Sequence, residues 1–137
     1  MVLDCSVTLA WFLPDEQSAL ALEALETAGS DGATVPFHWY AEMANGLLTA
    51  LKRHRIADDA VDQAFSALAK MPLTIERGSF GRVDTNLVIF ARQSGLTVYD
   101  ALYLDCARRL RLPLATFDKA LALAAKSAAV PVLGPYK

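Results

Sequence analysis

Four carboxylates stand at the ends of predicted helices and strands, where side chains from separate parts of a chain can meet. Asp4 follows the first apolar run of the sequence, and Asp118 follows another, Leu114 to Thr116. Asp100 and Glu42 each lie near the start of an apolar helix. Oxygen ligands with no His or Cys among them favour Mg²⁺ or Mn²⁺ over zinc. These residue types therefore predict a magnesium site, with manganese as the alternative ion.

A site of this kind can hydrolyse a phosphodiester bond. One or two divalent cations bind the scissile phosphate, lower the pKa of a water molecule and stabilise the leaving oxygen, so that no side-chain nucleophile is needed. We expect Asp4 and Asp100 to be direct ligands of the cation. Glu42 and Asp118 would bind through water or orient the attacking water.

Some of these acids also have an ordinary structural role open to them. Thr97 and Asp100 have the spacing of a capping box, and Asp4 can cap the helix that follows it. Neither role excludes cation binding. Asp105 lies about 140° from Asp100 around the same helix and forms a polar stripe with two arginines. We therefore expect Asp105 to be solvated and to take no part in the site.

Short apolar strands alternate with helices along the whole chain. This pattern predicts a parallel sheet with helices on both faces, a three-layer α/β/α sandwich whose strand ends bring the acids to one edge. The expected strands are residues 2–4, 33–36, 73–75, 114–116 and 130–133. The expected helices are residues 5–14, 15–28, 37–54, 57–71, 80–94 and 120–128, and one more that has Asp100 near its start and lies within the stretch from Val98 to Leu121.

The composition fits one compact domain over residues 1–137. The chain is 54% hydrophobic and 20% charged, which is enough apolar material for a core. Its net charge of −2 argues against a protein that coats nucleic acid. The first apolar segment is interrupted by Asp4, and no run reaches the roughly 18 apolar residues of a membrane span, so we expect a cytoplasmic protein with no membrane partner.

The cysteines and histidines carry no expected chemistry. Cys5 and Cys106 lie in apolar segments without the spacing of metal ligands, which indicates buried free thiols. His38 and His54 are expected to be solvated rather than catalytic, since neither falls at the predicted acid-bearing edge.

Four segments contain these acids and follow one another as MVLDCSVTLAWFLP, PFHWYAEMANGLL, LTVYDALYLDCA and LATFDKAL. In this order and spacing they resemble PIN domains, and specifically the VapC-type toxins of bacterial toxin–antitoxin pairs. By that likeness the family's metal-binding acids correspond to Asp4, Glu42, Asp100 and Asp118. The polar residues that commonly accompany those acids correspond to Ser6, Asn45 and Thr116.

The resemblance implies a five-stranded sheet of order 3-2-1-4-5 and an endoribonuclease that depends on Mg²⁺ or Mn²⁺. It also implies three partners: an RNA substrate, a second copy of the chain in a homodimer, and a small VapB-like antitoxin that inhibits the enzyme. No acid of the pattern is missing, so the resemblance implies an active enzyme.

Two other functions remain compatible with clustered acids. One is a catalytically silent PIN-like interaction module whose acids bind an arginine of a partner. The other is a flavodoxin-like phosphatase or phosphoacceptor. Such proteins usually present adjacent acids at the first strand and a lysine on a late strand. Here the first strand is followed by Asp-Cys-Ser, and Lys119 comes directly after Asp118.

Overall fold

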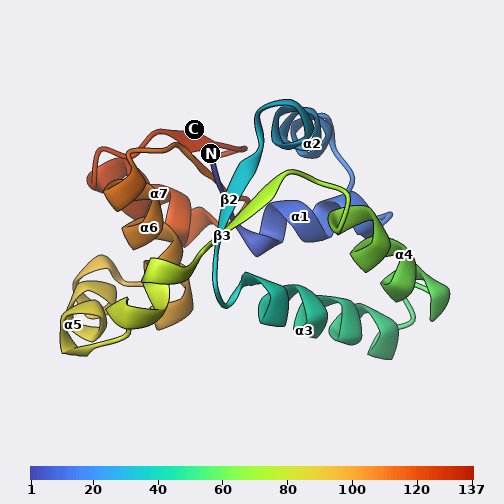
Figure 1. The fold of residues 1–137 in the computed structure, drawn as a ribbon, viewed down its shortest axis with the longest axis horizontal. Helices are drawn as coiled ribbons and strands as arrows, with labels where there is room; N and C mark the ends of the chain where they lie inside the picture. The colour runs from blue at the N-terminus through green and yellow to red at the C-terminus, as the bar shows by residue number, and fades with distance from the viewer.

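Five short parallel strands form one sheet at the centre of the structure, a computed structural model that describes residues 1–137 (Figure 1). Their order is β3-β2-β1-β4-β5, and every neighbouring pair is parallel. The strands are β1 (Val2–Leu3), β2 (Ala33–Pro36), β3 (Leu73–Glu76), β4 (Leu114–Ala115) and β5 (Val132–Leu133). The predicted parallel sheet and the strand order implied by the resemblance are confirmed.

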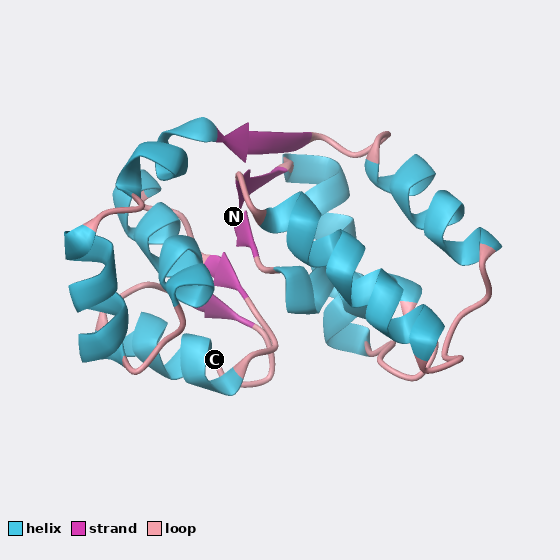
Figure 2. Ribbon diagram, turned by 90° about the horizontal axis from the view of Figure 1, so that it is seen from below, coloured by secondary structure: helices cyan, strands magenta, loops and turns pink.

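Helices lie on both sides of this sheet and make the three predicted layers (Figures 1 and 2). One layer contains α1 (Cys5–Phe12), α2 (Ala19–Asp31), α3 (Trp39–Lys52) and α4 (Asp59–Leu68). The other contains the 3₁₀ helix η1 (Arg77–Arg82), α5 (Thr85–Ser94), α6 (Val98–Leu110) and α7 (Lys119–Ser127). The chain changes sides after β3 because right-handed crossovers in opposite directions lie on opposite faces. None of the helices combines the length and the apolar character that crossing a lipid bilayer requires.

The middle of the sheet and α6 share the main hydrophobic core. Val2 and Leu3 are both inaccessible to solvent, because β1 is the central strand and is covered on both faces. Helix α6 packs against β1 and β2 and buries Leu104 and Ala107 completely. Asp4 directly follows β1, and Asp100 lies in the first turn of α6. The best-packed elements of the fold therefore carry these two acids.

The helix expected over residues 15–28 begins later than predicted. Ser18, rather than Asp15, is the N-cap of α2, and its hydroxyl accepts a hydrogen bond from the backbone N–H of Ala21 at 3.2 Å. Asp15 instead binds the Arg55 guanidinium, with the closest N–O distance at 2.8 Å. Both Ser and Asp are good N-caps. A distant arginine recruits Asp15 and leaves the cap to Ser18.

The helix expected over residues 80–94 is divided into two. Residues 77–82 form η1, and α5 begins at Thr85. The Asp84 carboxylate accepts a hydrogen bond from the backbone N–H of Leu87 at 3.0 Å, which satisfies one of the free amides at the start of α5. This cap separates the two helices.

Candidate active site

Asp4 lies at the carboxyl end of β1 with only 5% of its surface exposed. Its side chain does not cap α1, although Asp4 occupies the N-cap position. Instead, Oδ2 accepts hydrogen bonds from Ser6 Oγ at 2.5 Å and from Thr116 Oγ1 at 2.6 Å. The capping role considered for Asp4 is therefore wrong, and two hydroxyls fix the direction of its carboxylate.

The same two hydroxyls join the ends of β1 and β4. Ser6 Oγ accepts a hydrogen bond from the backbone N–H of Phe117, and Thr116 Oγ1 accepts one from the backbone N–H of Asp118, both at 3.0 Å. Each hydroxyl accepts from the backbone, so its own proton is available to the Asp4 carboxylate. The backbone that carries Asp118 thereby also orients Asp4.

Glu42 projects from α3, and a residue of α6 sets its position. The Tyr103 hydroxyl donates a hydrogen bond to Oε2 of Glu42 at 2.5 Å. Nε2 of His38 lies 3.3 Å from the same oxygen. The Tyr103 side chain is fully buried, so water does not compete with Glu42 for its hydroxyl. The other oxygen of Glu42, Oε1, has no protein partner.

Tyr103→Phe is expected to lower the free energy of unfolding by about 1 to 2 kcal/mol, because it removes a hydrogen bond to a carboxylate. Tyr40→Phe is the control, since the Tyr40 hydroxyl makes no hydrogen bond and its loss should cost less than about 0.5 kcal/mol. Urea denaturation of both variants measures the difference. Equal costs would mean that the hydroxyl of Tyr103 does not stabilise Glu42.

The expectation of a solvated His38 is wrong. The side chain is 7% exposed and packs edge-on against Tyr103, with 4.9 Å between ring centroids. Neither ring nitrogen makes a hydrogen bond, although Nε2 is within ion-pair distance of Glu42. His38 follows the end of β2 by two residues, as Ser6 follows β1 by about the same interval. That shared position is the signal that could have placed His38 at the acid-bearing edge.

Asp100 and Asp118 each use one oxygen at the start of a helix. The Thr97 hydroxyl accepts a hydrogen bond from the backbone N–H of Asp100 at 3.1 Å and donates one to Asp100 Oδ2 at 2.6 Å. The predicted Thr97 cap is confirmed, with the hydroxyl rather than the backbone N–H as the partner of the carboxylate. Asp118 is the N-cap of α7, and its Oδ1 accepts a hydrogen bond from the backbone N–H of Leu121 at 2.7 Å.

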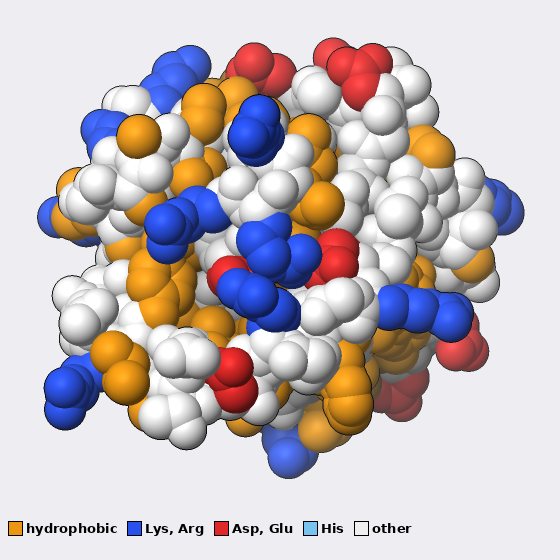
Figure 3. Space-filling view, turned by 60° about the vertical axis from the view of Figure 1, so that its left-hand side comes forward, with side chains coloured by type: hydrophobic (Ala, Val, Ile, Leu, Met, Phe, Trp, Pro, Cys, Tyr) orange, Lys and Arg blue, Asp and Glu red, His pale blue; other side chains and the backbone are white.

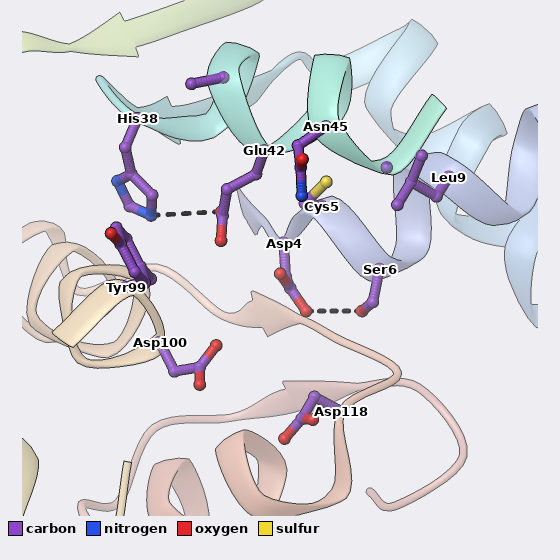
Figure 4. A pocket seen from close by; sticks show the side chains of 12 residues that line it. Asp4, Cys5, Ser6, Leu9, His38, Glu42, Asn45, Tyr99, Asp100 and Asp118 are labelled. Atoms are coloured by element: carbon purple, nitrogen blue, oxygen red, sulfur yellow. Dashed lines mark hydrogen bonds and ion pairs between the residues drawn. The ribbon is translucent and has the colours of Figure 1, made fainter. Parts of the chain in front are cut away.

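These side chains line one pocket of roughly 600 Å³. Figure 4 shows the carboxylates around a common opening, each carried by a different segment of the chain. The lining includes six of the residues singled out from the sequence, namely Asp4, Ser6, Glu42, Asn45, Asp100 and Asp118. The seventh, Thr116, is fully buried and reaches the site through its bond to Asp4. The pocket lining contains no Lys or Arg.

Each of the four carboxylates is anchored through one oxygen only. The hydrogen bonds described above use Oδ2 of Asp4, Oε2 of Glu42, Oδ2 of Asp100 and Oδ1 of Asp118, and the second oxygen of each has no protein partner. No three Asp, Glu, His or Cys side chains lie close enough together to hold a metal ion as they stand. The donor set fits Mg²⁺ or Mn²⁺, and a shared ion requires these side chains to move closer together.

The environment of the pocket disfavours the charged forms of Asp4 and Asp100. Burial raises the pKa of Asp4 from 3.8 to about 6, and the nearby Glu42 adds to this rise, while the two hydroxyls that bind Asp4 oppose it. Burial also raises the pKa of Asp100, and Asp118 and Glu42 raise it further. A cation among these groups would favour their charged forms. The site therefore lacks a positive charge that a divalent cation would supply.

Both cysteines are free and buried, as predicted. Cys5 lines the pocket, and burial raises the pKa of its thiol well above the usual range. A protonated thiol is neither a nucleophile nor a metal ligand. The pocket therefore offers carboxylate oxygens, and no thiolate, to a cation.

Asp105 lies outside the pocket although it shares α6 with Asp100. Its carboxylate accepts hydrogen bonds from Arg109 Nε at 2.7 Å and from Arg82 Nη2 at 3.2 Å. Over the face formed by α5 to α7, Lys and Arg side chains lie beside Asp and Glu (Figure 3). The predicted pairing of Asp105 with arginine is confirmed, although its side chain is only 15% exposed rather than solvated.

The sequence was compared with models of known protein families to identify the family to which this fold belongs. A family model described as PIN domain matches residues 1–127. The chain belongs to the PIN domain family. The resemblance seen in the sequence is confirmed, and membership of this family replaces the flavodoxin-like alternative.

Two proteins of Pyrobaculum aerophilum are similar to this PIN domain, one in sequence and one in structure. Ribonuclease VapC3 is 29% identical over 122 residues, which cover 89% of this chain and 92% of the relative. A crystal structure of the protein PAE2754 matches with a TM-score of 0.69 at 18% identity, covering 96% of this chain and 87% of that chain. The structural match supports the fold, and the sequence match supports a relationship along nearly the whole chain.

Proposed function

We propose that this PIN domain is an endoribonuclease that depends on Mg²⁺ or Mn²⁺ and acts as the toxin of a toxin–antitoxin pair. One observation carries the proposal: four carboxylates from separate segments line a single pocket, and each keeps one oxygen free of protein partners. The sequence likeness to Ribonuclease VapC3 supports RNA as the substrate and a toxin as the role.

Asp4 and Asp100 are the proposed direct ligands of the cation. Burial raises the pKa of both, so both gain most from a nearby positive charge. A bound divalent cation supplies charge that neutralises the scissile phosphate and acidifies a water molecule. Ser6 and Thr116 keep Asp4 in place, because both hydroxyl protons are directed at its carboxylate rather than at a phosphate.

Glu42 and Asp118 are the proposed groups that orient the attacking water. Each has one oxygen held by the protein and one that faces no protein donor. A carboxylate oxygen can accept a hydrogen bond from water and take up its proton as the water attacks phosphorus. Asn45 lines the same pocket, and its amide N–H can donate to a phosphate oxygen.

The proposed partners follow from the same pocket and the same relative. A VapB-like antitoxin would inhibit by placing an Arg or Lys among the four carboxylates, because a charge-assisted hydrogen bond competes with a cation for the same oxygens. A homodimer, which the resemblance to VapC-type toxins implies, and a cytoplasmic location, which the apolar pattern of the sequence led us to expect, are part of this proposal.

The proposal is tested by incubating pure, antitoxin-free protein with RNA that contains unpaired loops. Millimolar Mn²⁺ or Mg²⁺ should support cleavage, EDTA should stop it, and excess Mn²⁺ should restore it. Asp4→Asn purified in parallel controls for a contaminating nuclease. Cleavage that persists in EDTA would overturn the metal mechanism. A complete lack of cleavage with either ion would favour the catalytically silent interaction module.

A further inference from the structure

Aromatic rings form a continuous group from the pocket to the protein surface. We call Phe37, His38, Phe80 and Tyr99 the aromatic ledge. Ring centroids are 6.0 Å apart for Tyr99 and His38, 5.6 Å for His38 and Phe37, and 5.4 Å for Phe37 and Phe80. Tyr99 and His38 line the pocket, and Figure 4 shows them together beside Asp100 and Glu42. Tyr99 and His38 therefore form one side of the proposed active site, and Phe37 and Phe80 extend the ledge beyond it.

Two rings of the aromatic ledge are exposed to solvent. Tyr99 is 60% exposed and Phe80 is 72% exposed, whereas Tyr103, four residues after Tyr99 on the same helix, is fully buried. The Tyr99 hydroxyl makes no hydrogen bond that would explain its position. Single exposed apolar residues are common in soluble proteins. Two exposed rings that are joined to the pocket through edge-on and tilted ring contacts present faces that a flat ligand can cover.

The charge of the pocket also favours a source of affinity for RNA that needs no basic side chain. No Lys or Arg lines the pocket, four carboxylates do, and the whole chain has a net charge of −2. Phosphate contacts by basic side chains usually supply most of the affinity for nucleic acid. Stacking of bases on aromatic side chains needs no positive charge, and proteins use it to bind unpaired strands.

We propose that Tyr99, with Phe80 outside it, stacks unpaired nucleobases of the RNA next to the scissile phosphate. Tyr99 directly precedes Asp100, so a base on its ring lies beside the proposed cation site. A base within a duplex has no free face for such a ring, so the substrate at this position is single-stranded. This inference rests on the proposed ribonuclease function and specifies how its substrate is held.

The first test compares steady-state cleavage of a short single-stranded RNA whose cut site has been mapped. Tyr99→Ala should lower kcat/KM by roughly 5- to 100-fold, mainly through KM, which corresponds to the loss of one stacked base. Tyr99→Phe keeps the ring and should stay within about two-fold of the parent. Tyr136→Ala is the matched control, since Tyr136 is also partly exposed but does not line the pocket.

The second test uses RNAs that each lack one base near the cut. For the parent, kcat/KM should fall by a similar factor on one of these abasic RNAs. For Tyr99→Ala, kcat/KM should fall little further on that RNA, because the missing base and the missing ring remove the same stacking contact. Two results would overturn the stacking proposal: effects of the variant and of the missing base on kcat/KM that multiply, or a Tyr99→Ala variant that cleaves the intact RNA as well as the parent does. A change in oligomer mass without a change in KM would also overturn it, because the ring would then contact protein.

Binding separates this inference from the proposed function. Labelled single-stranded RNA can be titrated with protein carrying Asp100→Asn, with Mn²⁺ present, and followed by fluorescence anisotropy. Adding Tyr99→Ala to that protein should weaken binding by a similar factor. If the parent binds RNA through Tyr99 but never cleaves it, the ribonuclease proposal fails and the stacking site stands. If the parent cleaves RNA and Tyr99→Ala binds and cleaves RNA as well as the parent does, only the stacking proposal fails.

Discussion

Asp100→Asn is expected to lower kcat/KM for RNA cleavage by at least about 100-fold at millimolar Mn²⁺. The amide matches the carboxylate in size and can still accept the hydrogen bond from Thr97. It is neutral, however, and a poor ligand for a hard cation. The start of α6 should therefore survive while the proposed ligand is lost. Steady-state kinetics on a mapped RNA measures the effect.

Asp105→Asn is the matched control for Asp100→Asn. It makes the same chemical change on the same helix, but outside the pocket, at a carboxylate bound to Arg109 and Arg82. We expect kcat/KM to stay within about two-fold of the parent, because Asp105 contacts only arginines that lie outside the pocket. Equal losses in the two variants would show that the faces of α6 are wrongly assigned.

Asp4→Asn is expected to raise the melting temperature of the metal-free protein by several degrees at neutral pH. Burial raises the pKa of Asp4 from 3.8 to about 6 in the folded protein, so keeping this carboxylate charged costs about 3 kcal/mol of stability. The amide avoids that cost but gives up about 1 kcal/mol of hydrogen bonding with Ser6 and Thr116. The expected net gain is about 2 kcal/mol in EDTA.

The advantage of Asp4→Asn should disappear as the pH falls. A carboxyl whose folded-state pKa is raised stabilises the protein below its unfolded pKa, and that contribution is lost as the pH rises through the folded pKa. The difference in melting temperature between parent and variant should therefore close as the pH falls from about 6 to about 4. These limits are the pKa of Asp4 in the folded protein and its ordinary value. Melting curves of parent and variant in EDTA over this range measure the change.

Two controls accompany these melting curves. Asp58→Asn removes an exposed carboxylate that makes no capping hydrogen bond, so its melting temperature should follow the parent at every pH. Added Mn²⁺ should stabilise the parent by binding its native state and should narrow the gap to Asp4→Asn. If Asp4→Asn melts below the parent at every pH in EDTA, Asp4 is a structural residue rather than a destabilised ligand.

Features that depend on local periodicity could be predicted from the sequence. The strand at Ala33–Pro36 lies where its apolar run places it. Asp100 and Asp105 fall on different surfaces because the helix repeat alone fixes the angle between them. The strand order had no such local signal, since it depends on pairing between distant segments, and only the resemblance to PIN domains supplied it.

Features that depend on contacts between distant residues could not be predicted. Asp15 binds Arg55, 40 residues later, instead of capping a helix. Tyr103 reaches Glu42 across two helices, and the rings around His38 bury a residue that looks polar and exposed in the sequence. Each case is decided by which partner lies nearby in the folded chain, and no neighbouring residue in the sequence carries that information.

The gathering of the four acids lies between these two cases. Strand ends and helix starts predict that Asp4, Glu42, Asp100 and Asp118 line one pocket. Side-chain rotamers then decide how close their oxygens come, and each carboxylate turns one oxygen to its own protein partner. As they stand, no three of them can hold one ion. A cation must therefore either break these internal hydrogen bonds or bind the carboxylate oxygens that they leave free.

Calorimetric titration of Mn²⁺ into the metal-free protein tests this most directly. The parent should bind the ion saturably in the pocket. Asp100→Asn should bind the ion at least roughly 10- to 100-fold more weakly, and Asp105→Asn should bind it with the affinity of the parent. Saturable binding that is weakened by Asp100→Asn and not by Asp105→Asn would place the cation in this pocket with Asp100 as a ligand. No binding by the parent, or equal binding by all three proteins, would contradict the account.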